Sequence, residues 1–274
     1  MSQPVIFTDL DGTLLDPENY GFTAALPALD FVKAAGIPLV FCSSKTRAEI
    51  EYWRERLENS HPFISENGGA IFLPLSYFST DEIGAVWEGA ETIDGYVVLV
   101  LGIPYRLLRD QLQELQRNGF KVRGFGDMTA EEVAEVTGLK LEQVKLAKQR
   151  EFDEPFVFLG QGTKVKKLLA SIEEKGLRHS QGRFYHLMGD NDKGRAVDKL
   201  KTLYQRRFGD IVSIAIGDSP VDFPMLEKVD YPVLVRNYKG EHDPRISLPN
   251  LIRSQGIGPK GWNETVLHLL GETL

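Results

Sequence analysis

Apolar runs and amphipathic segments alternate along most of the chain. Runs that are apolar on both faces, as in buried strands, occupy residues 4–10, 37–42, 211–218 and 231–237. Segments with apolar residues every three or four positions, as in helices, occupy residues 26–36, 46–59 and 192–209. Because parallel strands buried on both faces need helices on either side, this alternation predicts an α/β protein with a parallel sheet.

The pattern is less regular between residues 84 and 189. Strand-like runs there are more separated and partly amphipathic, at 95–102, 155–160 and 182–189. They alternate with helical segments at 104–119 and 129–138. We therefore expect a second, α+β domain, residues 84–189, inserted into a Rossmann-like parallel-sheet core formed by residues 1–83 and 190–274.

Length, composition and charge narrow the class of protein. The 274 residues, 42% of them hydrophobic, can bury a full core, and the single cysteine, Cys42, excludes an internal disulfide. No run approaches about 18 uninterrupted apolar residues and no signal region opens the chain, so we expect a cytoplasmic protein without a membrane partner. The net charge of -7 argues against nucleic acid as a partner, because such binding needs clustered Lys and Arg.

Aspartates gather where two predicted strands end. Asp9 and Asp11 stand two residues apart, on one face of the first strand, and Asp218 ends the strand 211–218. Asp222 follows, near a helix start that Pro224 favours. Because the carboxyl ends of parallel strands face the crevice where ligands bind, these four carboxylates are expected to converge on one cation.

The chemistry of these ligands favours magnesium over calcium. A calcium-binding loop that begins at Asp9 would need Gly and Glu where Leu14 and Tyr20 stand. Mg²⁺ takes one or two protein carboxylates, several waters and the oxygens of a substrate phosphate. The pattern therefore predicts a Mg²⁺ site that also receives a phosphate group.

Groups suited to phosphate follow two further elements. Ser43 ends the strand 37–42, just before a helix that Thr46 and Glu49 open as a capping box, so free backbone N–H groups lie close by. Lys193 stands at a helix start, where the helix dipole disfavours a cation. Its position there indicates a functional role.

These motifs resemble, in order, the four motifs of the haloacid dehalogenase superfamily of phosphohydrolases: "DLDGT" at 9–13, Ser43, "DKG" at 192–194 and "GDSPVD" at 217–222. The resemblance implies that Asp9 attacks phosphorus and forms an aspartyl-phosphate. Asp11 would act as general acid and then as general base. Ser43 and Lys193 would hold the phosphoryl oxygens.

The same resemblance implies a metal site and a cap class. Asp9, the backbone carbonyl of Asp11, and Asp218 would bind Mg²⁺, with Asp222 in support. Val221 departs from the family, which usually has Asn there, and this puts a loop hydrogen bond in doubt. About 150 residues separate the second motif from the third, which implies the large α/β cap.

A closer resemblance, to mannosyl-3-phosphoglycerate phosphatases, covers nearly the whole chain. It rests on "CSSKTRAE", "FISENGGAIF", "TAEEVAEVTGL", "REFDEPF", "GRFYH" and "GPKGW". It implies hydrolysis of mannosyl- or glucosyl-3-phosphoglycerate, a phosphorylated sugar acid, to the glycosylglycerate, a compatible solute, and phosphate. Two alternatives stay open: another sugar phosphatase of this architecture, such as one for sucrose phosphate, and a catalytically silent phosphate-binding protein.

Candidate substrate residues lie in the matching motifs. Because the substrate carries a phosphate and a carboxylate, we expect further cationic groups to bind it. The candidates are Lys45, Arg47, Arg150 and Arg183, each of which is equally explained as a solvated surface charge. Glu66 and Asn67 are expected at the cap entrance. Tyr185 and His186 lie in a cap strand, where we expect one of the two to pack in the core.

Overall fold

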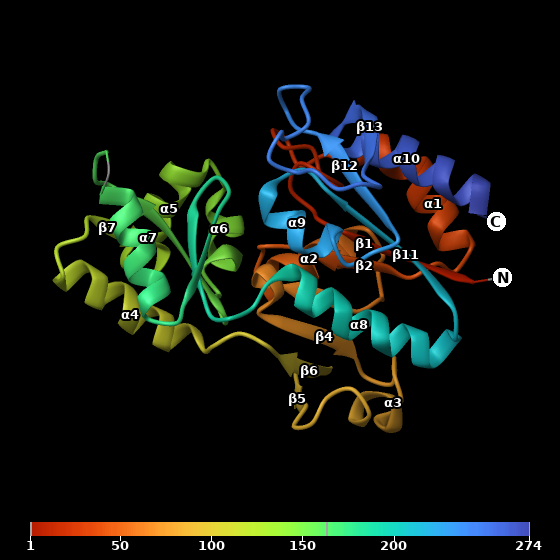
Figure 1. Cartoon of the computed structure of the whole chain (residues 1–274), viewed down its shortest axis with the longest axis horizontal. Helices are drawn as coiled ribbons and strands as arrows, with labels where there is room; N and C mark the ends of the chain where they lie inside the picture. Colours follow the sequence, from red (N-terminus) through yellow and green to blue (C-terminus); the bar gives the residue numbers. More distant parts are fainter. Residues whose placement is uncertain (1, 163, 274) are drawn as a thin grey trace.

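The chain folds into two lobes, each built around a sheet of its own (Figure 1). The computed structural model describes residues 2–162 and 164–273. Within these residues the larger sheet has nine strands, in the order β13-β12-β11-β1-β2-β3-β4-β6-β5, and the smaller has four, in the order β7-β8-β10-β9. The predicted α/β class, with a parallel core sheet and a separate α+β unit, is confirmed.

Parallel strands form the part of the larger sheet that carries the motif residues. They are β1 (Gln3–Thr8), β2 (Leu39–Cys42), β3 (Phe63–Ser65), β11 (Ile211–Gly217), β12 (Tyr231–Arg236) and β13 (Ile252–Ile257). An antiparallel extension adds β4 (Ala70–Pro74), β6 (Tyr96–Val100) and β5 (Glu91–Ile93). Thr8 of β1 lies opposite Phe41 and Ile216, so three strands end at the same edge.

Helices cover both faces of the larger sheet. One face carries α1 (Leu26–Ala34), α2 (Arg47–Arg56) and α10 (Gly258–Thr273), and the other α3 (Thr80–Gly84), α8 (Lys193–Phe208) and α9 (Phe223–Leu226). Ile6 of β1 packs in the first layer with Trp262, whereas Phe7 packs in the second with Leu200. This two-sided burial explains why β1 is apolar throughout. Among the residues described, no helix is both long and apolar enough to cross a bilayer.

The smaller lobe is an antiparallel sheet with helices on it. Its strands are β7 (Val122–Gly124), β8 (Asp153–Phe158), β9 (Arg178–Gln181) and β10 (Tyr185–Met188). Its helices are α4 (Tyr105–Arg117), α5 (Ala130–Thr137), α6 (Leu141–Ala147) and α7 (Lys164–Glu174). Leu112 of α4 and Ile172 of α7 pack on Phe156 of the sheet. The Thr46 hydroxyl of the larger lobe donates a 2.9 Å hydrogen bond to the carbonyl of Leu146, which joins α6 to α2.

The first residue of the smaller lobe differs from the boundary that we expected. We expected the cap to span residues 84–189, with the strand 95–102 inside it. Instead β6 pairs with β4 in the larger sheet, because Val98 fills one buried layer of that sheet and Leu99 fills the other. The smaller lobe therefore begins with α4. That this lobe acts as a substrate-selecting cap domain stays a prediction.

Candidate active site

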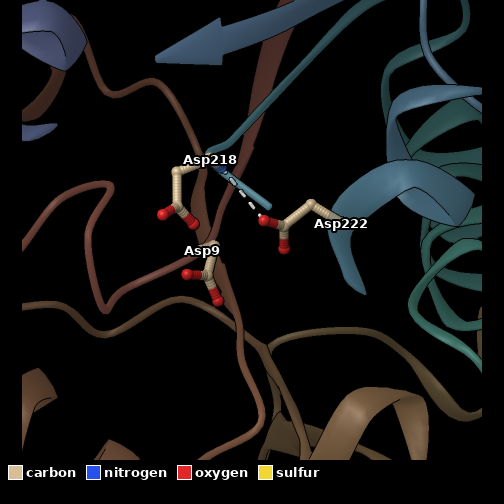
Figure 2. A group of neighbouring side chains, drawn as sticks. All are labelled: Asp9, Asp218 and Asp222. Carbon is tan, nitrogen blue, oxygen red and sulfur yellow. Dashed lines mark hydrogen bonds between the residues drawn. The ribbon is translucent and has the colours of Figure 1, made fainter. Parts of the chain in front are cut away.

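Three aspartates converge at the carboxyl edge of the parallel strands (Figure 2). Asp9 follows β1, Asp218 follows β11, and Asp222 ends the short 3-10 turn η4 (Pro220–Asp222). One carboxylate oxygen of each lies within 4.8 Å of the others. The structure thus brings together three of the four aspartates that we expected at one cation.

Asp222 organises the loop around it. Its Oδ2 accepts hydrogen bonds from the backbone N–H groups of Asp218 and Ser219, both at 3.1 Å, and from the Ser219 hydroxyl at 3.2 Å. Val221, where the family resemblance led us to expect Asn, lies in the same turn, between Pro220 and Asp222. Because Asp222 satisfies the loop's N–H groups, the loop keeps these bonds without an Asn at 221.

Lys193 is buried between two of the carboxylates. It is the first residue of α8, and its Nζ lies 2.7 Å from Asp9 Oδ1 and 2.6 Å from Asp222 Oδ1. Burial alone would lower the pKa of Lys193, but the charges of Asp222 and Asp9 outweigh it and raise that pKa. These two ion pairs explain how an ammonium group is tolerated at a helix N-terminus.

The cluster still carries more negative than positive charge. Burial raises the pKa of Asp9 to about 7, although the charge of Lys193 opposes this. Burial, followed by the charges of Asp222 and Asp9, also raises the pKa of Asp218 well above its ordinary value. Within the described chain the Asp218 carboxylate has no hydrogen-bond or ion-pair partner. A cation would relieve this repulsion.

The donor set fits a hard divalent cation. The cluster offers carboxylate oxygens, which are the ligands that such ions prefer. The loop after Asp9 passes close to Asp218 because residue 12 is glycine: its φ is +82°, and a Cβ there would lie 2.7 Å from Asp218 Oδ2. These residues could therefore hold a metal ion.

The Asp11 side chain lies apart from this cluster and contacts Lys45. Its Oδ2 is 2.8 Å from Lys45 Nζ, while its Oδ1 is buried without a hydrogen-bond partner in the described chain. Burial alone would lower the pKa of Lys45, but the nearby charges of Asp11 and Glu49 raise it. Lys45, which we expected to bind substrate, thus lies in the cleft as the ion-pair partner of the predicted general acid.

Ser43 lies beneath the cleft surface. Its side chain is almost fully buried, and its hydroxyl accepts a hydrogen bond from the backbone N–H of Lys45 at 3.4 Å. Its contact with a phosphoryl oxygen stays a prediction. Its neighbour Cys42 is buried in the sheet, and burial raises the pKa of its thiol, as expected for a core residue.

A cleft of about 990 Å³ opens over these carboxylates between the two lobes. The larger lobe contributes Asp9, Asp11, Lys193 and Asp218 to its wall. The smaller lobe contributes Phe125, Leu139, Pro155, Phe184 and His186. The loop 237–245 after β12 completes the rim with Tyr238, Lys239, His242 and Arg245, which our sequence analysis did not anticipate.

Arg150 and Arg183, both predicted substrate residues, line this cleft. Arg150 is buried and donates hydrogen bonds to the carbonyls of Ser44 (2.8 Å) and Ala147 (2.9 Å), so it bridges the lobes. Arg183 is exposed on the turn between β9 and β10, where it lies over the Phe184 ring. Direct substrate contact remains a prediction for both residues.

Arg47, Glu66 and Asn67 are not among the residues that line the cleft, and their contact with substrate stays a prediction. Arg47 is occupied by ion pairs with Asp94 at 2.9 Å and Glu151 at 3.4 Å. The Glu66 carboxylate accepts the backbone N–H groups of residues 151 and 152, at 2.9 and 2.8 Å. Arg47 and Glu66 thus link the two lobes through their contacts with residues 151 and 152 of the smaller lobe.

Asn67 contacts a hydrogen-bonded pair, Asp153 and His186, that we did not predict. Its Nδ2 donates to Asp153 Oδ2 at 3.0 Å, and the same carboxylate lies 2.8 Å from His186 Nδ1. The alternation along β10 separates His186, which lines the cleft, from Tyr185, which stacks on Phe156. The motifs "REFDEPF" and "GRFYH" contain both members of the pair, but their spacing does not reveal the contact.

Comparisons with known proteins agree with this geometry. Residues 6–85 match the model of the haloacid dehalogenase-like hydrolases. The fold resembles a solved Thermoplasma acidophilum protein, with a TM-score of 0.69 at 17% identity over 98% of this chain and 99% of that one. It also resembles sucrose-phosphatase from Synechocystis, with a TM-score of 0.62 at 15% identity over 98% of both chains. At these identities the similarity concerns the fold alone.

Curated relatives match over nearly the whole chain. The glucosyl-3-phosphoglycerate/mannosyl-3-phosphoglycerate phosphatase of Methanococcoides burtonii is 47% identical over 98% of this chain and 97% of its own length. The protein of the same name from Persephonella marina is 40% identical over 98% and 97%. The mannosyl-3-phosphoglycerate phosphatase of Pyrococcus horikoshii is 38% identical over 89% and 95%. The chain therefore belongs to the haloacid dehalogenase-like hydrolases, within the family that includes these phosphatases.

Proposed function

We propose that this protein hydrolyses glucosyl- and mannosyl-3-phosphoglycerate to the glycosylglycerate and phosphate. The observation that carries the proposal is the 47% identity to a phosphatase named for both substrates, which extends over 98% of this chain. That span includes the smaller lobe, whose side chains wall the cleft opposite Asp9. Sucrose phosphate is less supported as a substrate, because sucrose-phosphatase resembles this chain at only 15% identity.

The first chemical step is transfer of the phosphoryl group to Asp9. A carboxylate oxygen of Asp9 forms a bond to phosphorus while the bond from phosphorus to the glycerate oxygen breaks. Lys193, at 2.7 Å from Asp9, holds positive charge beside the phosphoryl oxygens, and Asp222 keeps its ammonium in place. The leaving oxygen takes a proton from the carboxyl group of Asp11.

The second step returns Asp9 to its carboxylate form. Water attacks phosphorus and gives a proton to the Asp11 carboxylate, and the bond from phosphorus to Asp9 breaks as phosphate leaves. Lys45 contacts Asp11 through Oδ2 at 2.8 Å, whereas Oδ1 has no hydrogen-bond partner in the described chain, so Oδ1 is the oxygen that would carry the acid proton. An incoming anionic substrate can draw the Lys45 ammonium toward itself and so open the pair.

Mg²⁺ is the metal that we propose for the acidic cluster. Asp9, Asp218 and the backbone carbonyl of Asp11 would hold it, with Asp222 supporting Asp218 through the loop N–H group. When bound, the ion would offset the repulsion between the phosphate and the carboxylates.

Substitution of the two carboxylates of the β11 loop should separate metal binding from stability. Asp218→Asn is expected to weaken Mg²⁺ binding by more than about 10²-fold, with little loss of stability in chelator, because its carboxylate has no protein partner. Asp222→Asn should cost about 3 kcal/mol of stability, because that carboxylate is buried against Lys193. Activity measured against Mg²⁺ concentration and urea unfolding in chelator test this assignment. The reverse order of effects would contradict it.

A panel of phosphate esters tests the proposed function. The ratio kcat/KM should be highest for mannosyl- or glucosyl-3-phosphoglycerate, at least about tenfold above sucrose 6-phosphate and simple hexose phosphates, because the cleft wall selects the non-reacting part. Phosphate release in Mg²⁺ buffer provides the measurement, with a chelated sample as control. A preference for hexose phosphates, or no turnover of any ester, would overturn the proposal.

A further inference from the structure

His186 is the buried histidine of the smaller lobe that faces the cleft. It lies on β10, opposite Pro155 of β8, and both residues line the cleft. Its neighbours Tyr185 and Leu187 point to the other face of the sheet and pack with the α4 and α7 layer. Only 8% of His186 is exposed, so the residue is held within the cleft wall.

Asp153 orients the imidazole ring. His186 Nδ1 lies 2.8 Å from Asp153 Oδ2 and 3.1 Å from Oδ1. Asp153 is fully buried, and Asn67 of the larger lobe also donates to it at 3.0 Å. Because a carboxylate only accepts hydrogen bonds, Nδ1 carries a proton and donates it. Nε2, on the opposite side of the ring, has no partner within the described chain.

Most other basic groups of the cleft already have partners. Lys193 contacts Asp9 and Asp222, Lys45 contacts Asp11, Arg150 donates to two carbonyls, and Arg245 pairs with Asp243. Arg183 and Lys239 lie exposed on the rim. His186 is therefore a basic residue of the inner wall whose second ring nitrogen is available for a ligand.

We propose that His186 Nε2 binds the carboxylate of the phosphoglycerate part of the substrate, with Asp153 as the positioning residue. This inference rests on the proposed function. The phosphate of the substrate meets Asp9 and Lys193, so its second anionic group needs a cation elsewhere in the same cleft. When both ring nitrogens carry a proton, Nδ1 donates to Asp153 and Nε2 donates a charge-assisted hydrogen bond to the substrate carboxylate.

A comparison of two substrates tests the contact. The first is glucosyl-3-phosphoglycerate, and the second is the matching glucosylglycerol phosphate, in which a CH₂OH group replaces the carboxylate. His186→Ala should lower kcat/KM about 10- to 100-fold for the carboxylate substrate and less than about threefold for the alcohol. His186→Gln, whose amide can donate from a similar position, should recover part of the loss.

Two further variants separate contact from structural effects. His179→Ala removes another histidine of the same sheet, one that pairs with Glu173 outside the cleft, and should leave both substrates unaffected. Asp153→Asn should reduce the preference for the carboxylate substrate, as His186→Ala does, because the imidazole ring loses the carboxylate that orients it. Hydrolysis of p-nitrophenyl phosphate, which lacks a carboxylate, monitors the intact active site and should be unchanged in His179→Ala.

The outcomes distinguish this inference from the proposed function. If His186→Ala and His186→Gln lower turnover of both glucosyl substrates equally, or of neither, the carboxylate contact is wrong. If the unmodified protein turns over neither glycosyl-3-phosphoglycerate, the proposed function fails, and the wild-type data alone reveal this. A preference for the carboxylate substrate that is lost specifically in the His186 variants supports the inference.

Discussion

Replacing Asp9 with asparagine is expected to abolish turnover of every phosphate ester, by on the order of 10⁶-fold, as for the loss of other enzymic nucleophiles. The amide has nearly the same size as the carboxylate but cannot attack phosphorus. Lys193 keeps its 2.6 Å contact with Asp222, so the variant should fold. Steady-state phosphate release measures the loss.

A matched control for this variant is Asp30→Asn, which changes an exposed aspartate on α1 outside the cleft. It should keep full activity. Turnover by Asp9→Asn within about tenfold of the unmodified protein would contradict the assignment of Asp9 as the nucleophile.

Asp11→Asn should have a smaller effect that depends on the leaving group. With a glycosyl-3-phosphoglycerate, loss of the acid and base is expected to slow turnover roughly 10²- to 10⁴-fold, because a sugar-acid alkoxide leaves poorly without a proton. With p-nitrophenyl phosphate, phosphoryl transfer to Asp9 should stay fast, since nitrophenolate needs no proton. Single-turnover kinetics on both esters provide the measurement. Equal slowing of that first step for both esters would show that Asp11 does not act as the acid.

The fold of the larger lobe could be predicted because its signals are local. β1 and β11 are apolar on both faces, and their ends deliver Asp9 and Asp218 to one edge without knowledge of any distant contact. Parallel pairing then brings the two aspartates together. The helix-start position of Lys193 indicated only a functional role, and its expected place at the phosphate came from the family resemblance.

The placement of β5 and β6 was missed because the choice of sheet is not a local property. Residues 91–93 are exposed and residues 96–100 are only partly buried, a pattern that fits an edge strand of either sheet. The pairing of β6 with β4 places both strands in the larger sheet, and this pairing depends on the path of the chain after α3.

The surroundings of the candidate substrate residues could not be predicted from the sequence, because the docking of the two lobes sets them. Arg47 follows the second motif closely, yet Glu151, more than a hundred positions away in the sequence, holds its guanidinium. Glu66 is likewise occupied by backbone N–H groups of residues 151 and 152. The orientation of His186 also depends on Asp153, which contacts its Nδ1 and is 33 positions away in the sequence.

Rapid acid quench of Asp11→Asn with p-nitrophenyl phosphate tests the central claim, that the reaction passes through a phosphoryl group on Asp9. We predict a burst of nitrophenolate equal to the enzyme concentration, then slow release, with a phosphoryl group on the peptide that contains Asp9. Loss of the burst with metal still bound, or a burst that persists in the double variant Asp9→Asn, Asp11→Asn, would contradict the claim.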